Sequence, residues 1–281
     1  MKQNERRKLV KTSLYRLFSI IKNFLEEYMI DTIGMTDIGN GRPSNQDAYL
    51  LRQKEKDGKL YLLAVVCDGM GGLKKGEIAS RYIVEVLKQW FDETLFERLS
   101  EMGIDMIEQN LIDLIRKINQ NLLLMSRRME EVKSMGSTLT LLFVEDHEFF
   151  VLNVGDSRTY WFDRDRKFVT TDHTLVELEL RAGHLTKEQA RKDPRRHILV
   201  QCVGVTKDIR VDCYKGRLHP GMEFLLCTDG FYGLLEEEEI YQVEASKEQM
   251  KEWVERCFRK VKSRGELDNL SCVIVKVPKE K

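Results

Sequence analysis

Apolar positions along the chain follow two different spacings, and each spacing predicts its own kind of element. Apolar residues three or four apart recur over 78–90 and 107–122, which is the repeat of one helix face. A further helix is predicted over 250–261, and the charged segment 175–196 is also expected to be helical. Short apolar runs bounded by turn residues predict strands. These runs lie at 61–67, 139–144, 149–154, 158–162, 210–214, 224–228 and 271–277.

Short polar turns join several of the predicted strands, and this favours antiparallel pairing. We expect 139–144, 149–154 and 158–162 to form a meander, and 210–214 to pair with 224–228. Helices before and after these strands indicate an α+β fold with antiparallel sheets rather than repeated β-α-β units. We assign residues 31–281 to one domain.

The first 30 residues differ from the remainder in charge and in pattern. They contain seven lysines and arginines against three glutamates. Apolar residues at alternating spacings of four and three predict an amphipathic helix; they are Val10, Leu14, Leu17, Ile21, Phe24 and Tyr28. We expect this helix to dock on its own domain. A partner helix and a peripheral contact with a membrane surface are the alternatives, and the basic residues permit the latter.

Composition narrows the class of protein. The 281 residues are 42% apolar and 33% charged, and 46 lysines and arginines balance 46 aspartates and glutamates. A nucleic-acid-binding protein would normally carry a basic excess, so this balance argues against that role. The six cysteines are scattered without a CxxC pair, which fits a reducing cytoplasm and not a disulfide scaffold or zinc site. The apolar runs fall short of the roughly 18 residues that a membrane span needs, so we expect a cytoplasmic protein.

Four aspartates stand in tight turns at the ends of predicted strands. They are Asp68 before Gly69, Asp156 after Gly155, Asp229 before Gly230, and Asp268 before Asn269. Carboxylates brought together from such distant segments repel one another strongly unless cations lie between them. The pattern therefore predicts a metal cluster.

An all-oxygen ligand set favours Mg²⁺ or Mn²⁺ over zinc or copper. The expected ligands are Asp68, Asp229 and Asp268, with Asp156 as a further candidate. Two such ions about 3.5–4 Å apart can share a water, lower its pKa and align it for attack on phosphorus. Asp68 is well placed to bridge both ions, and the glycine-rich turn 69–72 would let the Gly69 carbonyl add a ligand.

Arg42, in the loop 39–48, is the expected phosphate clamp. Its guanidinium fork matches two phosphate oxygens and stays charged at any working pH. Asp47, in the same loop, is expected to hold metal-bound waters from behind the direct ligands.

These residues resemble the metal-dependent protein serine/threonine phosphatases of the type 2C family, in their bacterial form. The matching motifs run in the family's order over almost all of residues 33–277. They are Thr36-Asp-Ile-Gly39 through Arg42, Asn45-Gln-Asp-Ala48, Val66-Cys-Asp-Gly-Met-Gly-Gly72, Gly136-Ser-Thr138, Asn153-Val-Gly-Asp-Ser-Arg158, Thr171-Asp-His173, Leu225-Leu-Cys-Thr-Asp-Gly230 and Asp268-Asn269.

The resemblance implies a four-layer α-β-β-α sandwich of two antiparallel sheets, with a binuclear Mn²⁺ or Mg²⁺ centre at one edge. It implies hydrolysis of phosphoserine and phosphothreonine in proteins by a water that bridges two ions. Asp68 would bridge both ions, Asp229 and Asp268 would hold the first, and the Gly69 carbonyl would hold the second. Asp156 matches the position that holds a third ion, with Asp229, in some members, and Arg42 matches the phosphate-binding arginine.

Two positions depart from the common pattern of the family. Gln46 stands where members often have a glutamate that helps to hold the second ion, so that ion is expected to bind more weakly or through water. Met70 stands where many eukaryotic members have a histidine proposed as general acid, so another group must take that role. His173 lies in a matching motif and is equally well explained as a structural histidine.

Residues 174–203 correspond to the flap that bacterial members place beside the metals. Its basic residues predict either a surface that steers anionic phosphopeptides or a solvated helix face; they are Arg181, Arg191, Lys192, Arg195, Arg196 and His197. By family analogy, the partners are phosphorylated proteins, such as a serine/threonine kinase or its substrates in a signalling pathway.

The alternative function is that of a pseudophosphatase, a phosphoprotein-binding or regulatory module without turnover. Its mark would be the loss of Asp68, Asp229 or Asp268, and all three residues are present. The retained acidic set together with Arg42 favours an active enzyme.

Overall fold

The structure is a computed structural model in which residues 30–71, 75–99, 102–128, 135–164, 166–240 and 246–279 are described. The helix predicted over residues 1–30 lies outside this range except for Ile30, as does Gly72 of the glycine-rich turn. Of the helices in the described part of the chain, none is long and apolar enough to span a membrane.

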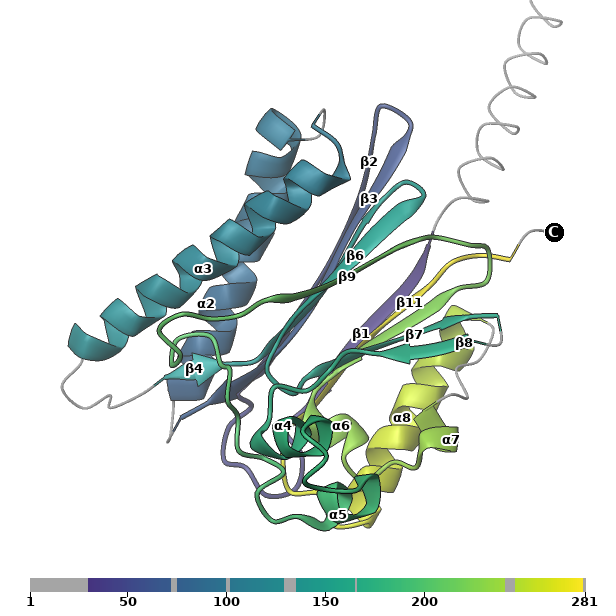
Figure 1. The fold of residues 1–281 in the computed structure, drawn as a ribbon. Coiled ribbons are helices and arrows are strands. Elements are labelled where there is room, and N and C mark those ends of the chain that lie inside the picture. The colour runs from purple at the N-terminus through teal and green to yellow at the C-terminus, as the bar shows by residue number, and fades with distance from the viewer. Residues whose placement is uncertain are drawn as a thin grey trace, which may run out of the picture.

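The strands of the described residues form two antiparallel sheets (Figure 1). The first sheet has the order β1 (Asp31–Asp37), β11 (Leu270–Lys276), β10 (Glu223–Cys227), β7 (Arg158–Asp163) and β8 (Arg166–Val169). The second has the order β2 (Asp47–Lys56), β3 (Lys59–Met70), β5 (Leu139–Glu145), β6 (Glu148–Val154) and β9 (Asp212–Arg217), with β4 (Gly136–Ser137) paired to the end of β3.

Helices cover the outer face of each sheet. The second sheet is covered by α2 (Lys75–Gln89), the π-helix η1 (Trp90–Leu99) and α3 (Ile104–Arg128), and the first sheet by α8 (Lys247–Ser263). Shorter helices follow strand ends or connect elements; they are α4 (Leu175–Arg181), α5 (Lys187–Lys192), α6 (Asp229–Tyr232) and α7 (Glu237–Ile240). The predicted α+β fold with a four-layer sandwich is confirmed.

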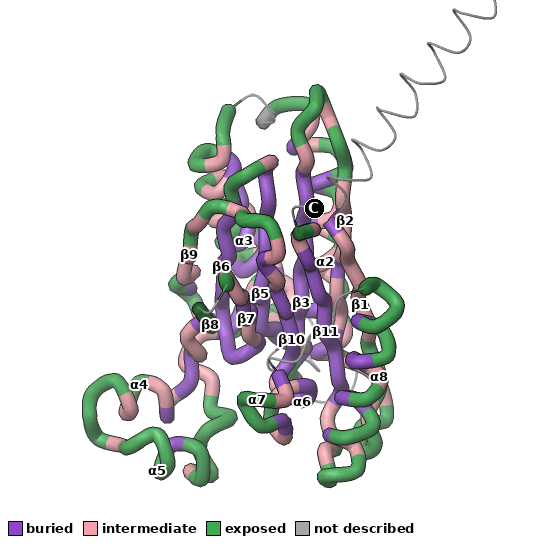
Figure 2. Tube along the Cα trace, turned by 90° about the vertical axis from the view of Figure 1, so that its right-hand side faces the viewer, coloured by how far each residue is buried: buried purple, intermediate pink, exposed green. Residues whose placement is uncertain are grey.

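Three apolar cores match the three interfaces between the four layers. One joins α2 and α3 to the second sheet, one joins α8 to the first sheet, and one lies between the sheets. Figure 2 shows the buried residues concentrated along the central strands.

Strand β3 is buried on both faces, which explains why its sequence is apolar without interruption. Leu63, Val65 and Cys67 belong to the core under the helices, whereas Leu62, Ala64 and Val66 belong to the core between the sheets. Successive side chains of a strand point to opposite faces, so a strand buried on both faces has no polar positions.

Two of the predicted strand pairings are wrong. The segments 139–144 and 149–154 form the hairpin β5–β6, but β7 leaves that sheet and pairs with β10 and β8. The turn at Gly155, with a φ of 105°, redirects the chain to the other sheet. The predicted pair 210–214 and 224–228 is also divided, because β9 pairs with β6 and β10 lies between β11 and β7. Both errors arise because a turn of a given length can join strands within one sheet or between two.

Candidate metal centre

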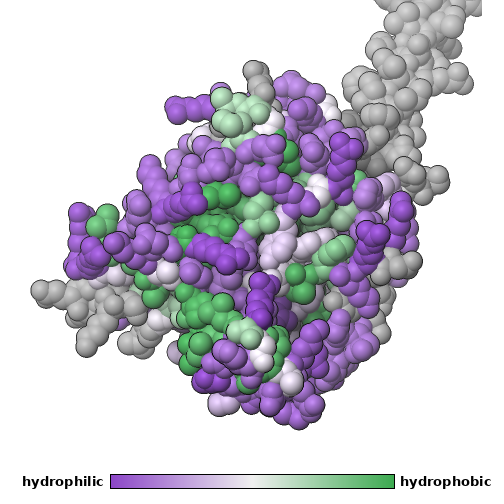
Figure 3. All heavy atoms as spheres, in the orientation of Figure 1, coloured by the Kyte–Doolittle hydropathy of each residue, from purple (hydrophilic) through white to green (hydrophobic). Residues whose placement is uncertain are grey.

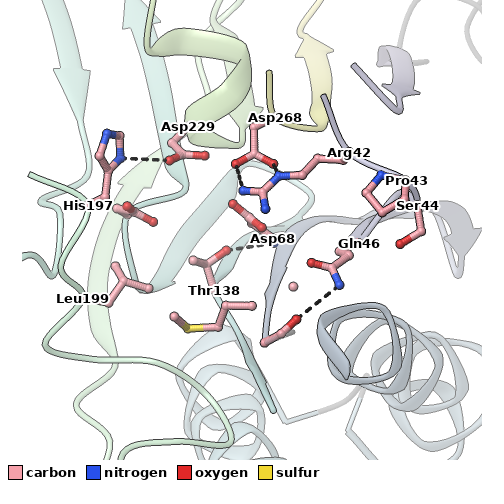
Figure 4. Close-up of a pocket in the computed structure, with 14 residues that line it drawn as sticks. Arg42, Pro43, Ser44, Gln46, Asp68, Thr138, His197, Leu199, Asp229 and Asp268 are labelled. Carbon is pink, nitrogen blue, oxygen red and sulfur yellow. Dashed lines mark hydrogen bonds and ion pairs between the residues drawn. The ribbon is translucent and has the colours of Figure 1, made fainter. Parts of the chain in front are cut away.

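The four aspartates predicted from the sequence line one pocket of about 370 Å³ (Figure 4). Asp68 lies near the end of β3, and Asp156 lies in the turn after β6. Asp229 begins α6 directly after β10, and Asp268 lies just before β11. Arg42, from the loop before β2, lines the same pocket. The predicted convergence is therefore observed.

Strand pairing and sheet packing bring these positions together. In the first sheet, Cys227 of β10 is opposite Cys272 of β11, so Asp229 and Asp268 lie just beyond neighbouring strand ends. Strand β3 of the second sheet packs across the interface against β10 and β11. The pocket thus lies at one edge of the sandwich, where strand ends of both sheets lie next to each other.

The Gly136-Ser-Thr138 motif fixes the backbone of Asp68. The Asp68 N–H donates to Thr138 Oγ1 at 2.9 Å, and the Thr138 N–H donates to the Asp68 carbonyl at 2.9 Å. The Ser137 hydroxyl donates to the same carbonyl at 2.9 Å, and Thr138 Oγ1 lies 2.7 Å from Ser157 Oγ. Because Ser137, Thr138 and Ser157 are buried, these hydrogen bonds are shielded from water and hold the carboxylate in place.

Asn269 fixes the loop that carries Arg42. Its amide donates to the carbonyls of Ile38 at 2.8 Å and Ser44 at 3.2 Å, and its oxygen accepts from the Gln46 N–H at 2.8 Å. The Arg42 guanidinium forms a fork with the Asp268 carboxylate, Nε to Oδ1 at 2.9 Å and Nη2 to Oδ2 at 2.6 Å. This fork has the geometry with which an arginine binds two oxygens of a phosphate.

Burial and mutual repulsion dominate the electrostatics of the cluster. Burial first, and then the carboxylates of Asp47 and Asp229, raise the pKa of Asp68 well above its usual range. Burial and the carboxylate of Asp229 raise the pKa of Asp156 in the same direction. Burial also opposes the charge on Asp229, but the hydrogen bond and charge of His197 prevail and lower the pKa of Asp229. Burial and repulsion therefore disfavour the charged forms of Asp68 and Asp156, and a cation nearby would favour them.

The remaining predicted positions lie around these ligands. Gln46 lines the pocket, and its amide nitrogen donates to the Gly71 carbonyl at 3.3 Å. Gly69 also lines it, and a Cβ there would lie 2.1 Å from the Gly76 carbonyl oxygen, so close packing against the start of α2 requires this glycine. Asp47 is opposite Asp68 in the β2–β3 ladder, is buried, and accepts a hydrogen bond from Thr228 at 3.0 Å. Burial raises the pKa of Asp47 to about 7.

The Thr171-Asp-His173 motif braces the turn that carries Asp156. Arg158 forms a fork with Asp172 at 2.8 and 2.7 Å, and His173 Nδ1 accepts the Gly155 N–H at 3.2 Å. His173 is buried and does not line the pocket. Its place in the structure is that of a structural histidine.

His197 and Leu199 line the pocket but were not singled out as site residues by the sequence. His197 Nδ1 lies 3.5 Å from Asp229 Oδ2, and both flap residues lie on one side of the pocket, across the carboxylates from Pro43 and Ser44 (Figure 4). The only local signal was that His197 belongs to the basic flap segment. Because these residues lie in a loop, they do not follow an apolar run that would allow their place in the site to be predicted from the sequence.

The residues present fit divalent cations. Asp229 Oδ1 is buried and, among the described residues, has no hydrogen-bond partner, so one ligand oxygen points at no donor of the protein. In the described residues, no group of three or more His, Cys, Asp or Glu side chains is arranged so that it could hold a metal ion. The Arg42 guanidinium lies 2.6 Å from the Asp268 carboxylate, and His197 Nδ1 lies 3.5 Å from Asp229 Oδ2. The donor set is entirely oxygen, which suits Mn²⁺ or Mg²⁺.

Comparison with known proteins agrees with this arrangement. The family model of protein phosphatase 2C matches residues 33–274. The serine/threonine phosphatase stp of Listeria innocua is 31% identical over 242 residues, which cover 85% of this chain and 93% of that protein. Among solved structures, the serine/threonine phosphatase Stp1 of Staphylococcus aureus is 27% identical with a TM-score of 0.77, over 89% of this chain and 95% of that one.

A more distant structure shows the same fold. The catalytic domain of the serine/threonine protein phosphatase PstP, solved with two manganese ions, is 22% identical with a TM-score of 0.73, over 89% of this chain and 98% of that one. The chain belongs to the protein phosphatase 2C family. It is a protein serine/threonine phosphatase.

Proposed function

We propose that this phosphatase hydrolyses phosphoserine and phosphothreonine in proteins with two divalent cations, Mn²⁺ or Mg²⁺, held by its aspartate cluster. The observation that carries the proposal is the presence of Asp68, Asp156, Asp229 and Asp268 in one pocket with Arg42. When bound, the ions supply a shared water of lowered pKa and offset the charge of the phosphate.

The proposed ligand roles are those that the resemblance to the family implies. Asp68 would contact both ions, Asp229 and Asp268 would hold the first, and the Gly69 carbonyl would hold the second. Gln46 would reach the second ion through water, and Asp156 with Asp229 would hold a third. Asp47, behind Asp68, would bind water ligands.

Arg42 acts on the substrate. Its fork is bound to Asp268 at 2.9 and 2.6 Å, and Asp268 is the residue that would turn to the first ion. Exchange of this carboxylate for a phosphate leaves both partners paired, so the guanidinium orients the substrate without losing its hydrogen bonds.

The proposal extends to the biological setting. Substrates would be phosphorylated proteins, such as a serine/threonine kinase or its targets. The cysteines of the described residues are free, which supports a reducing cytoplasm. We assign catalysis to residues 31–281 and leave 1–30 as an extension that can dock or touch a membrane. The intact acidic set weighs against a pseudophosphatase.

The test is hydrolysis of p-nitrophenyl phosphate and phosphothreonine peptides with Mn²⁺. Asp68→Ala and Asp229→Ala should each lower turnover by about 1,000-fold, because each removes a charge that the reaction needs. Asp113→Ala, an exposed aspartate on α3, is the matched control and should retain activity. Circular dichroism checks the fold. Activity of either pocket variant after exhaustive EDTA treatment would contradict the proposed mechanism.

A further inference from the structure

Two apolar side chains line the pocket beside its ionic groups. Met70, the last residue of β3, and Leu199 line it together with the carboxylates. Met70 is 38% exposed, and beside this wall Val205 is 45% exposed. Figure 3 shows apolar side chains gathered over the region between β4 and α4 on the face seen in Figure 1.

Backbone hydrogen bonds hold Leu199 in place. The N–H of Leu175 donates to the Ile198 carbonyl at 2.8 Å, and the N–H of Val200 donates to the His173 carbonyl at 2.8 Å. A second bridge joins Val203 to Ser137, next to the backbone of Asp68. The wall is thus tied at both ends to elements that carry the ligands.

Met70 is held from the same segment. It is opposite Gly136 in the β3–β4 pair, and its sulfur lies 2.9 Å from Cys202 Sγ. A Cβ on Gly136 would lie 2.6 Å from Val205 Cγ2 and 2.8 Å from Cys202 Sγ. Glycine at 136 therefore lets Cys202 and Val205 pack closely against the β3–β4 pair that ends in Met70.

We propose that Met70 and Leu199 form an apolar subsite that receives a bulky aliphatic side chain next to the phosphorylated residue of a protein substrate. The inference rests on the proposed function, because the phosphate must be held on the Arg42 side of the pocket. Adjacent Cα atoms of a peptide are about 3.8 Å apart, so the residue next to the phosphorylated one lies within reach of Met70 and Leu199. Contact between an aliphatic substrate side chain and Met70 and Leu199 would remove apolar surface of both from water, which favours binding.

The flap also offers charge as a competing basis for specificity. Arg195 is already paired with Glu179 at 2.9 Å and Asp193 at 2.8 Å, and Lys192 with Glu188 at 3.1 Å. These pairs offset much of the positive charge that an acidic flanking residue would require. The apolar wall lines the pocket itself, so it favours an aliphatic neighbour over an acidic one.

The experiment uses the full chain with Mn²⁺ and phosphothreonine peptides that differ only in the residue on either side of the phosphothreonine: Leu, Ala, Glu or Lys. We expect kcat/KM for the best Leu peptide to exceed that for its Ala counterpart by about 10-fold, mainly through KM. Leu199→Ser should reduce this ratio to about 2-fold. Ile198→Ser is the matched control, because Ile198 is 49% exposed, adjacent in sequence and outside the pocket lining, and it should keep the ratio.

Three results would contradict the proposed subsite. They are a wild-type ratio near one, a preference for Glu, or an equal loss of the ratio in Leu199→Ser and Ile198→Ser. Should Leu199→Ser unfold, Met70→Ser must lower the same ratio, and failure to do so would also overturn it. If p-nitrophenyl phosphate and every peptide resist hydrolysis, the proposed function fails. If all are hydrolysed equally well, only the subsite fails.

Discussion

The two sides of the pocket are built differently. On the acidic side, Asp68 and its neighbours stand at strand ends, and buried hydrogen bonds from Ser137 and Thr138 fix the backbone. On the flap side, two short helices are held by exposed ion pairs such as Arg195–Glu179 and by a few backbone bridges. Buried polar contacts cost much to remove, whereas exposed ion pairs contribute little.

This difference separates chemistry from recognition. The proposed ligands and Arg42 lie on the sandwich or in loops at the ends of its strands, where buried hydrogen bonds hold the backbone. Leu199, which we propose meets the variable part of a substrate, lies on a connecting segment that can change without disturbing the sheets. Substitutions on the two sides should therefore have effects of different kinds and sizes.

After Asp68→Ala and Asp229→Ala, the largest effect is expected at Arg42, the proposed phosphate clamp. Arg42→Lys keeps the charge but loses the fork, and we expect kcat/KM for a phosphothreonine peptide to fall by about 100-fold, with Arg42→Ala lower still. Steady-state kinetics with Mn²⁺ measures both. Equal activity of the lysine variant and the wild type would show that the fork has no role.

A matched pair of threonine substitutions compares the two sides directly. Thr138→Val leaves the Asp68 N–H and the Ser157 hydroxyl without their partner, and we expect about 10-fold lower activity and about 1–3 kcal/mol lower stability. Thr186→Val removes the N-cap of α5 in the flap, where Thr186 Oγ1 accepts from the Gln189 N–H. That variant should hydrolyse p-nitrophenyl phosphate within about twofold of wild type. Similar losses of activity in Thr138→Val and Thr186→Val would contradict the difference between the two sides of the pocket.

The acidic side should also give metal-free protein an unusual dependence on pH. Burial raises the pKa of Asp47 to about 7, and that of Asp68 is raised well above its usual range. A carboxyl with a raised folded-state pKa stabilises the fold fully below its unfolded pKa near 4, and this stability is lost as pH rises through the folded pKa. Between roughly pH 7 and pH 4, Asp47 adds about 1.4 kcal/mol per pH unit of falling pH.

Urea unfolding in EDTA measures this effect. The metal-free protein should be more stable at pH 6 than at pH 8, and Asp47→Asn should reduce the difference. A stability that rises steadily with pH over this range in EDTA would show that the carboxylates are not strained by burial and repulsion.

The smallest effect is expected at the flap surface. Arg195→Ala removes exposed ion pairs with Glu179 and Asp193, and screening by water leaves such pairs with little net value. We expect no measurable change in Tm. A clear loss of stability would mean that the flap is held more firmly than its surface pairs suggest.

The sequence predicted the acidic side better than the flap side for a physical reason. An apolar run that ends in Asp-Gly marks both a buried strand and the residue at its end, so the residue pattern alone was enough to place Asp68 and Asp229. His197 and Leu199 lie on a connecting segment without such a pattern. Their position depends on the backbone bridges to His173 and Ser137, which link residues far apart in the chain.

The pattern of apolar residues also did not predict which sheet each strand joins. The run 158–162 was predicted correctly as a strand, but its partner was not, because a polar turn at 155–157 is compatible with either sheet. The segment 175–196 forms two short helices rather than a continuous one, with Gly183 at a φ of 75° between them. The strand 31–37 lacked a signal strong enough to be predicted, although it pairs along its whole length.

That strand has a consequence for biosynthesis. The first strand described, β1, pairs residue by residue with the last, β11, from Asp31 opposite Lys276 to Asp37 opposite Leu270. During synthesis β1 therefore lacks its β11 partner until residues 270–276 have left the ribosome, and the proposed ligand Asp268 is made only just before that segment. The proposed metal centre can thus form only after the domain has been synthesised through β11.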